Sequence, residues 1–107
     1  MGIRDYHDRR TAAFVEGERV PQFEQCAKQA VKAIAKLQSA SQLIDLRNSP
    51  SNHFEALEGE EGRYSIRINK KWRACFRWAV TEAAPEGKDA LMVQGEPYDV
   101  EITNHYD

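Results

Sequence analysis

Six basic side chains lie between Arg63 and Trp78, and no acidic residue interrupts them. They are Arg63, Arg67, Lys70, Lys71, Arg73 and Arg77. A guanidinium group donates paired hydrogen bonds in a fixed geometry, which suits the oxygens of a phosphate. Acidic residues gather on both sides of this run, so the net charge of -2 conceals a local positive patch. The clustering predicts a surface that binds nucleic-acid phosphates.

The same segment has the two-residue period of a β-hairpin with one apolar and one polar face. Two alternating runs are joined by the polar turn Asn69-Lys70-Lys71. The apolar positions are Tyr64, Ile66 and Ile68 in the first run and Trp72, Ala74, Phe76 and Trp78 in the second. We expect the two tryptophans to pack in the core rather than stack on bases. We also expect Arg67, Arg73 and Arg77 to lie close together on the polar face.

Helical periodicity precedes the hairpin. Pro21 suits the first turn of a helix, and apolar residues recur every three or four positions from Gln22 to Leu37. They are Phe23, Ala27, Ala30, Val31, Ile34 and Leu37. Shorter helical segments are expected from Thr11 to Glu16 and around Leu43, Ile44 and Leu46. Lys28, Lys32 and Lys36 recur every four residues, and we interpret this stripe as a solvated helix face.

The chain after the hairpin predicts further strands. Within the polar stretch from Thr81 to Pro97, the residues Leu91-Met92-Val93 could form a short strand. Alternation from Tyr98 to Ile102 predicts a last strand. Helices followed by an antiparallel sheet predict a single α+β domain over residues 1–107, with the helices packed on one face of the sheet.

The composition is that of an ordinary globular domain, with 41% hydrophobic and 30% charged residues. No run approaches the roughly 20 apolar residues of a membrane span. The first twenty residues carry too many charges for a secretion signal, so we expect a soluble, cytoplasmic protein. Cys26 and Cys75 lack Cys or His partners at metal-ligand spacing, and we expect free, buried thiols with no metal or other cofactor.

Five segments, in order and at the right spacing, resemble HigB-type toxins of the RelE/ParE superfamily. They are GERV at 17–20, SNHFEALEG at 51–59, YSIRIN at 64–69, WRACFRW at 72–78 and DVEI at 99–102. The resemblance covers nearly the whole chain, although the stretch from Thr81 to Pro97 is longer than the loop typical of the family. It implies a RelE-like fold, in which Ile3 to His7 would supply an additional strand.

The resemblance also implies an activity and partners. HigB-type toxins cut messenger RNA in the A site of the ribosome, and a helix-turn-helix antitoxin of the HigA type, encoded beside them, binds and neutralises them. ParE relatives poison DNA gyrase instead, so the resemblance leaves messenger RNA and gyrase open as targets.

RNA can be cut without a metal when its 2′-hydroxyl attacks the neighbouring phosphate, which requires a base, a cation near the phosphate and an acid. His53 matches a histidine used by HigB toxins, and Arg73 matches their Trp-Arg step. We expect His53, Arg73, His105 and Tyr106 to be catalytic. We expect Arg63, Arg67, Lys70, Lys71 and Arg77 to bind RNA.

The carboxyl terminus departs from the family pattern. HigB toxins commonly end in Asp-Tyr-His, where this chain reads Asn104-His105-Tyr106, so an amide replaces the carboxylate and the two rings exchange places. Either His105 acts from a bent terminus, or Tyr106 takes the ring position, or the site is weakened. The rival hypothesis is therefore a non-catalytic module of the same fold that occupies RNA, the ribosome or gyrase. A housekeeping RNA-binding protein unrelated to toxins is a third.

Overall fold

The computed structural model describes residues 2–81 and 90–104. Its helical elements are α1 (Arg9–Val15), the 3-10 helix η1 (Pro21–Cys26), α2 (Ala27–Ser39), α3 (Leu43–Arg47), and the 3-10 helices η2 (Pro50–Asn52) and η3 (Ala90–Met92). Its strands are β1 (Glu55–Ala56), β2 (Arg63–Arg67), β3 (Arg73–Val80) and β4 (Gly95–Thr103).

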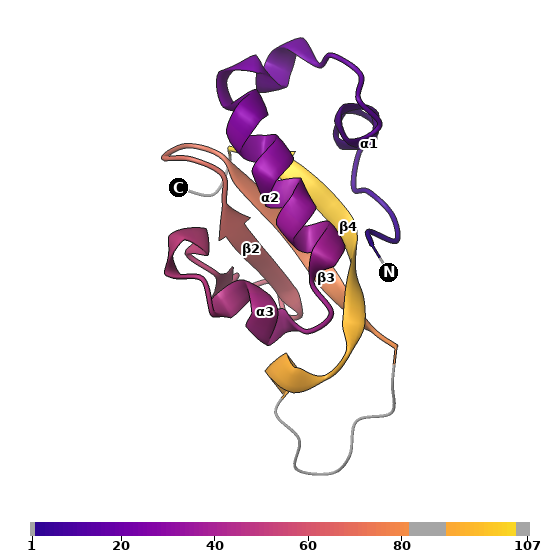
Figure 1. Ribbon diagram of the computed structural model, residues 1–107, viewed down its shortest axis with the longest axis vertical. Coiled ribbons are helices and arrows are strands. Elements are labelled where there is room, and N and C mark those ends of the chain that lie inside the picture. Colours follow the sequence, from indigo (N-terminus) through magenta and orange to yellow (C-terminus); the bar gives the residue numbers. More distant parts are fainter. Residues whose placement is uncertain (1, 82–89, 105–107) are drawn as a thin grey trace.

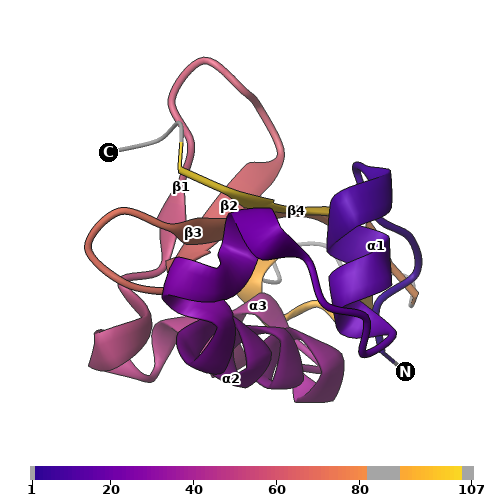
Figure 2. The ribbon, with the colours of Figure 1, turned by 90° about the horizontal axis from the view of Figure 1, so that it is seen from above.

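Within the described residues, the four strands form one antiparallel sheet in the order β1-β2-β3-β4. Helices α2 and α3 cover one face of this sheet (Figure 1). Viewed from above, they form a layer below the strands, and the loop that joins β1 to β2 projects to the other side (Figure 2). The predicted α+β arrangement is confirmed, and it is consistent with a RelE-like fold.

The core lies between the sheet and α2. Leu37, Ile66, Phe76 and Val100 are all fully buried there, so the apolar face predicted for the hairpin is confirmed. The three- and four-residue spacing from Gln22 to Leu37 predicts one buried helix face that includes Val31, but Val31 is 58% exposed. Positions 30, 34 and 37 point at the sheet, and Val31 is rotated about 100° from position 30, past the edge of the contact.

Two local predictions differ from the structure. The helix expected from Gln22 begins as the 3-10 helix η1, in which Phe23 and Cys26 stack at i and i+3 and are both buried. The strand expected at Leu91-Met92-Val93 is wrong, because Leu91 and Met92 belong to η3. An apolar run of three residues is too short for its period to distinguish a strand from a helical turn.

The amino-terminal segment lies beside β4 but forms less than a strand. The backbone N–H of Arg4 donates to Pro97 O at 2.8 Å, and that of His7 donates to Val100 O at 2.9 Å. Tyr6 and Val100 form an isolated parallel bridge. The additional strand that the family resemblance implied over Ile3 to His7 is thus reduced to this bridge. No helix in the described part of the chain is long and apolar enough to cross a membrane.

Candidate nucleic-acid interface

The turn between β2 and β3 is fixed by the side chain of Asn69. Its Oδ1 accepts hydrogen bonds from the backbone N–H groups of Lys71 and Trp72, each at 2.9 Å. An asparagine that bonds the backbone two and three residues ahead closes a tight turn. The tryptophans anchor the hairpin as predicted: Trp72 meets Phe23 edge to face, and Trp78 Nε1 donates to Val93 O at 3.3 Å.

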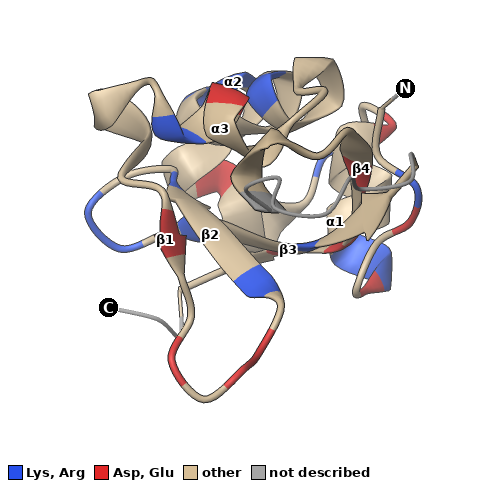
Figure 3. Ribbon diagram, turned by 90° about the horizontal axis from the view of Figure 1, so that it is seen from below, with Lys and Arg blue, Asp and Glu red and all other residues tan. Residues whose placement is uncertain are grey.

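The strand register separates the hairpin arginines into two pairs. Arg67 lies opposite Arg73 at the turn end, whereas Arg63 lies opposite Arg77 at the far end. The expectation that Arg67, Arg73 and Arg77 lie close together is therefore wrong for Arg77. Acidic residues mark the far end: the loop between β1 and β2 is drawn partly red, and the β2–β3 turn is blue (Figure 3).

Arg63 is buried in an ion-pair network and cannot serve as an RNA contact in this arrangement. Its side chain is 6% exposed, and its Nη2 donates to Glu101 Oε1 at 2.7 Å. Its Nη1 lies 3.1 Å from Glu60 Oε1. Arg77 is only partly exposed, with Nε 3.5 Å from Asp99 Oδ2 and Nη1 donating to Glu61 O at 3.2 Å. Both guanidinium groups are thus bound by acceptors of the chain itself.

His53 lies at the turn end of the hairpin with an unusual backbone conformation. It follows η2 with φ 46° and ψ 48°, the left-handed region, which non-glycine residues adopt only when the surroundings hold them there. Its N–H donates to Pro50 O at 3.1 Å. The preceding residue, Asn52, is 2% exposed and locks this turn to the helices.

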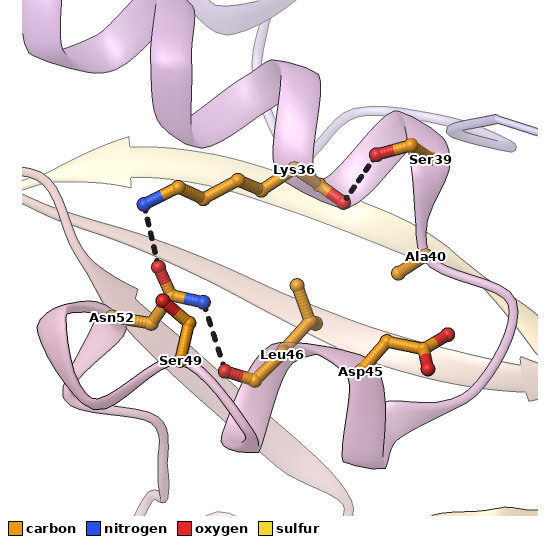
Figure 4. A pocket seen from close by; sticks show the side chains of 7 residues that line it. All are labelled: Lys36, Ser39, Ala40, Asp45, Leu46, Ser49 and Asn52. Carbon is orange, nitrogen blue, oxygen red and sulfur yellow. Dashed lines mark hydrogen bonds between the residues drawn. The ribbon is translucent and has the colours of Figure 1, made fainter.

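The side chain of Asn52 lies between α2 and α3 (Figure 4). Its Nδ2 donates to Leu46 O at 2.8 Å, and its Oδ1 accepts from Lys36 Nζ at 2.6 Å. A buried amide with both ends satisfied rigidifies the segment that carries it. Lys36 and Asn52 therefore fix the amino-terminal side of His53.

Arg73 fixes the other side of His53. Its Nη2 donates to the His53 carbonyl oxygen at 2.9 Å and lies 2.9 Å from Glu55 Oε1. Its Nε donates to Ser65 Oγ at 2.9 Å. The side chain is largely buried, so Arg73 acts here as a clamp between β2, β3 and the His53 loop.

The ring of His53 contacts the guanidinium of Arg67, with 3.3 Å between His53 Nε2 and Arg67 Nη1. A guanidinium has only donors, so this contact requires Nε2 to accept. The lone pair of Nε2 then faces the permanent positive charge of Arg67.

His53 and Arg67 line a groove of about 440 Å³ between α2 and the turn end of the hairpin. The other lining residues are Gln29, Lys32, Ala33, Lys36, Ser51, Ile68, Asn69 and Lys70. Lys71 lines a neighbouring hollow with Gln25 and Trp72. The interpretation of the α2 lysine stripe as a plain solvated face is incomplete, because two of its three members reach this groove. Their four-residue spacing was the signal in the sequence.

Two other groups bear on the chemistry. Burial raises the pKa of the Cys75 thiol to about 12, so it is not a nucleophile, and both cysteines are free and buried as predicted. Among residues 2–81 and 90–104, no three His, Cys, Asp or Glu side chains gather closely enough to hold a metal ion. The predicted catalytic residues His105 and Tyr106 lie outside the described residues. Strand β4 ends at Thr103, opposite Arg73, so the described chain stops beside this end of the hairpin.

Comparisons with known proteins agree with the resemblance. A family model described as "RelE-like toxin of type II toxin-antitoxin system HigB" matches residues 6–87. The chain is 49% identical over 43 residues to Toxin HigB-1 of Vibrio cholerae, a match that covers 39% of this chain and 45% of that protein. It is 48% identical over 46 residues to an uncharacterized protein of Haemophilus influenzae, covering 41% of this chain and 46% of that protein. The chain thus matches about half the length of these curated relatives. Because the family model spans most of the sequence, the chain belongs to the family of RelE-like HigB toxins of type II toxin–antitoxin systems.

Proposed function

We propose that this chain is a ribosome-dependent messenger endoribonuclease whose reaction needs no metal. The observation that carries the proposal is His53, held from both sides in a left-handed conformation with its Nε2 against Arg67. Such strain clusters at active sites, where a fixed geometry is part of the mechanism.

In the proposed reaction, the Arg67 guanidinium leaves His53 Nε2 for the phosphate, and the freed Nε2 takes the proton of the 2′-hydroxyl as the hydroxyl oxygen forms a bond to the adjacent phosphorus. The bond from phosphorus to the 5′-oxygen breaks, and the products are a 2′,3′-cyclic phosphate and a 5′-hydroxyl. Arg67 stabilises the negative charge that develops on the phosphate. Lys70 and Lys71, at the turn, contact neighbouring phosphates.

Arg73 acts mainly as a positioning residue in this scheme. Its guanidinium already binds the carbonyl of His53 and the carboxylate of Glu55, which is half exposed. The leaving 5′-oxygen needs a proton, for which His105 and Tyr106 remain the candidates. The non-catalytic alternative, a module that occupies RNA, the ribosome or gyrase, is favoured by Asn104, because an amide cannot accept a proton where the family pattern has a carboxylate.

As a toxin of a type II pair, the chain implies an antitoxin. We propose that this partner is a helix-turn-helix protein of the HigA type, and that the chain acts in the cytoplasm. A neighbouring reading frame for such a protein would support the pair.

Induced expression of the full chain tests the nuclease. We expect growth arrest together with new 5′ ends inside coding sequences, and loss of both in His53→Ala. His7→Ala is the matched control, because His7 is also an exposed histidine but lies beside Asp99, away from the groove. Growth arrest without new ends, in cells that make the folded protein, would support the binding module instead.

A further inference from the structure

We propose that the α2 side of the groove is a second phosphate-binding wall, built by Lys32 and Lys36, which receives the backbone of single-stranded RNA next to the nucleotide at His53. The choice of RNA as the ligand rests on the proposed function. The wall itself rests on the groove geometry, on its charge and on the second role of Lys36.

The groove is positively charged on both sides. Lys32 and Lys36 line it from α2, and Arg67 and Lys70 line it from the hairpin. None of its lining residues is acidic. Within the described residues, neither Lys32 nor Lys70 forms an ion pair. Like charges that converge without a counter-charge repel one another unless an anion lies between them.

Lys36 contributes charge as well as structure. Its Nζ donates to Asn52 Oδ1, but an amide oxygen carries no formal charge, so the ammonium group is held in place without being neutralised. Lys32 lies one helical turn away, about 6 Å along the axis. The two ammonium groups thus place two positive charges along α2, where they can bind successive phosphates of a flexible polyanion.

The remaining polar side chains of the groove favour a nucleic acid over an acidic protein. Gln29 lines it with an amide group, which both donates and accepts hydrogen bonds as base edges require. Asn69 adds the N–H groups of its Nδ2 as donors, since its Oδ1 is used in the turn. The groove also opens onto His53, the residue we place at the scissile bond. An RNA strand that passes between α2 and the hairpin would therefore meet the lysine wall beside the reacting nucleotide.

The stripe supplies its own control. Lys28 stands on the same face of α2, four residues before Lys32, and is not among the residues that line the groove. Lys28→Gln and Lys32→Gln remove the same charge from the same exposed helix, so neither is expected to change folding. Lys36 is unsuitable as a test residue because it also supports Asn52.

The test is the salt dependence of binding of the purified full chain to a single-stranded RNA of about 10 nucleotides. The RNA carries 2′-O-methyl groups, so that no 2′-hydroxyl can attack, and binding is followed by fluorescence anisotropy. The logarithm of the association constant falls linearly with the logarithm of the salt concentration, and each phosphate contact makes this slope steeper by about 0.7. We expect Lys32→Gln to make the slope shallower by about 0.7. Its loss of affinity relative to wild type should therefore grow roughly two- to threefold when the salt concentration falls from 200 to 50 mM.

Lys28→Gln should retain the wild-type slope. Equal slopes for Lys32→Gln and Lys28→Gln would overturn the proposal. The proposal would also be overturned if polyglutamate binding depended on Lys32 while RNA binding did not. That result would indicate an acidic protein as the partner of the groove. The same experiment separates this proposal from the proposed nuclease. If the wild-type chain binds RNA with a slope that depends on Lys32 but generates no new 5′ ends in cells, the phosphate-binding wall stands and the proposed catalysis is wrong.

Discussion

Replacing Arg63 with methionine separates a structural arginine from an RNA-binding one. The side chain of Arg63 is 6% exposed, and its guanidinium bridges the carboxylates of Glu101 and Glu60. Methionine keeps much of the length and packing of the side chain but removes the charge. The substitution therefore leaves a partly buried carboxylate at Glu101 without its closest cation.

Removing one partner of a buried ion pair costs about 3–5 kcal/mol. The low end applies here, because the side chains of Glu60 and Glu101 retain 31% and 17% exposure and water can solvate them in part. We therefore expect Arg63→Met to lower the free energy of unfolding by about 3 kcal/mol. For a domain of this size, 1 kcal/mol corresponds to about 4 °C in the melting temperature, so the decrease should be roughly 10–15 °C.

Thermal and urea denaturation followed by circular dichroism measure this change, with Arg67→Met as the matched control. Arg67 lies on the same strand but is partly exposed, and its side chain contacts the exposed His53 ring. Its replacement should therefore change stability by less than about 0.5 kcal/mol. RNA affinity, measured below the melting temperature, should fall for Arg67→Met and not for Arg63→Met. An Arg63→Met protein with wild-type stability and weakened RNA binding would refute the reasoning.

Three further predictions follow from single contacts. Asn52→Leu leaves the Leu46 carbonyl without its donor and should lower the free energy of unfolding by about 2 kcal/mol in urea denaturation. Hydrogen bonds from the backbone N–H of Gln42 and from Ser41 hold the pKa of Asp45 below its usual value. The ionised Asp45 carboxylate therefore stabilises the folded state above about pH 3.9, and this stabilisation is lost as the pH falls through the lowered pKa. Asp45→Asn should therefore cost up to about 1 kcal/mol at pH 7 and less at pH 3; an equal cost at both would contradict this. Burial raises the pKa of Cys75 to about 12 and that of Cys26 above its usual value, so both thiols should react with a disulfide reagent only as fast as the chain unfolds.

The hairpin could be predicted because its signals are local. Alternation of period two places each side chain on one face, and Asn69 closes the turn through bonds to residues two and three positions away. The buried face of α2 was predictable for the same reason. The prediction was wrong at Val31 because the width of the contact between α2 and the sheet cannot be predicted from the sequence of the helix alone.

The candidate site could be predicted only in part, because it depends on contacts between distant segments. The partner of Arg63, Glu101, lies 38 residues further along the chain, so alternation alone could not distinguish this buried arginine from the accessible Arg67. The lysine stripe of α2 likewise gains meaning only when the helix packs beside the hairpin. The hydrogen bond from the Arg73 guanidinium to the His53 carbonyl joins residues that lie 20 positions apart, and no residue pattern predicts it.

The chemical ends of the cut messenger test the central claim most directly. Attack by the 2′-hydroxyl with His53 as base predicts fragments with a 5′-hydroxyl and a 2′,3′-cyclic phosphate or its hydrolysed 3′-phosphate. These ends should appear when the wild-type chain is expressed, persist in His7→Ala, and disappear in His53→Ala. Fragments that carry 5′-phosphates, or the same ends at the same level in His53→Ala, would contradict the account.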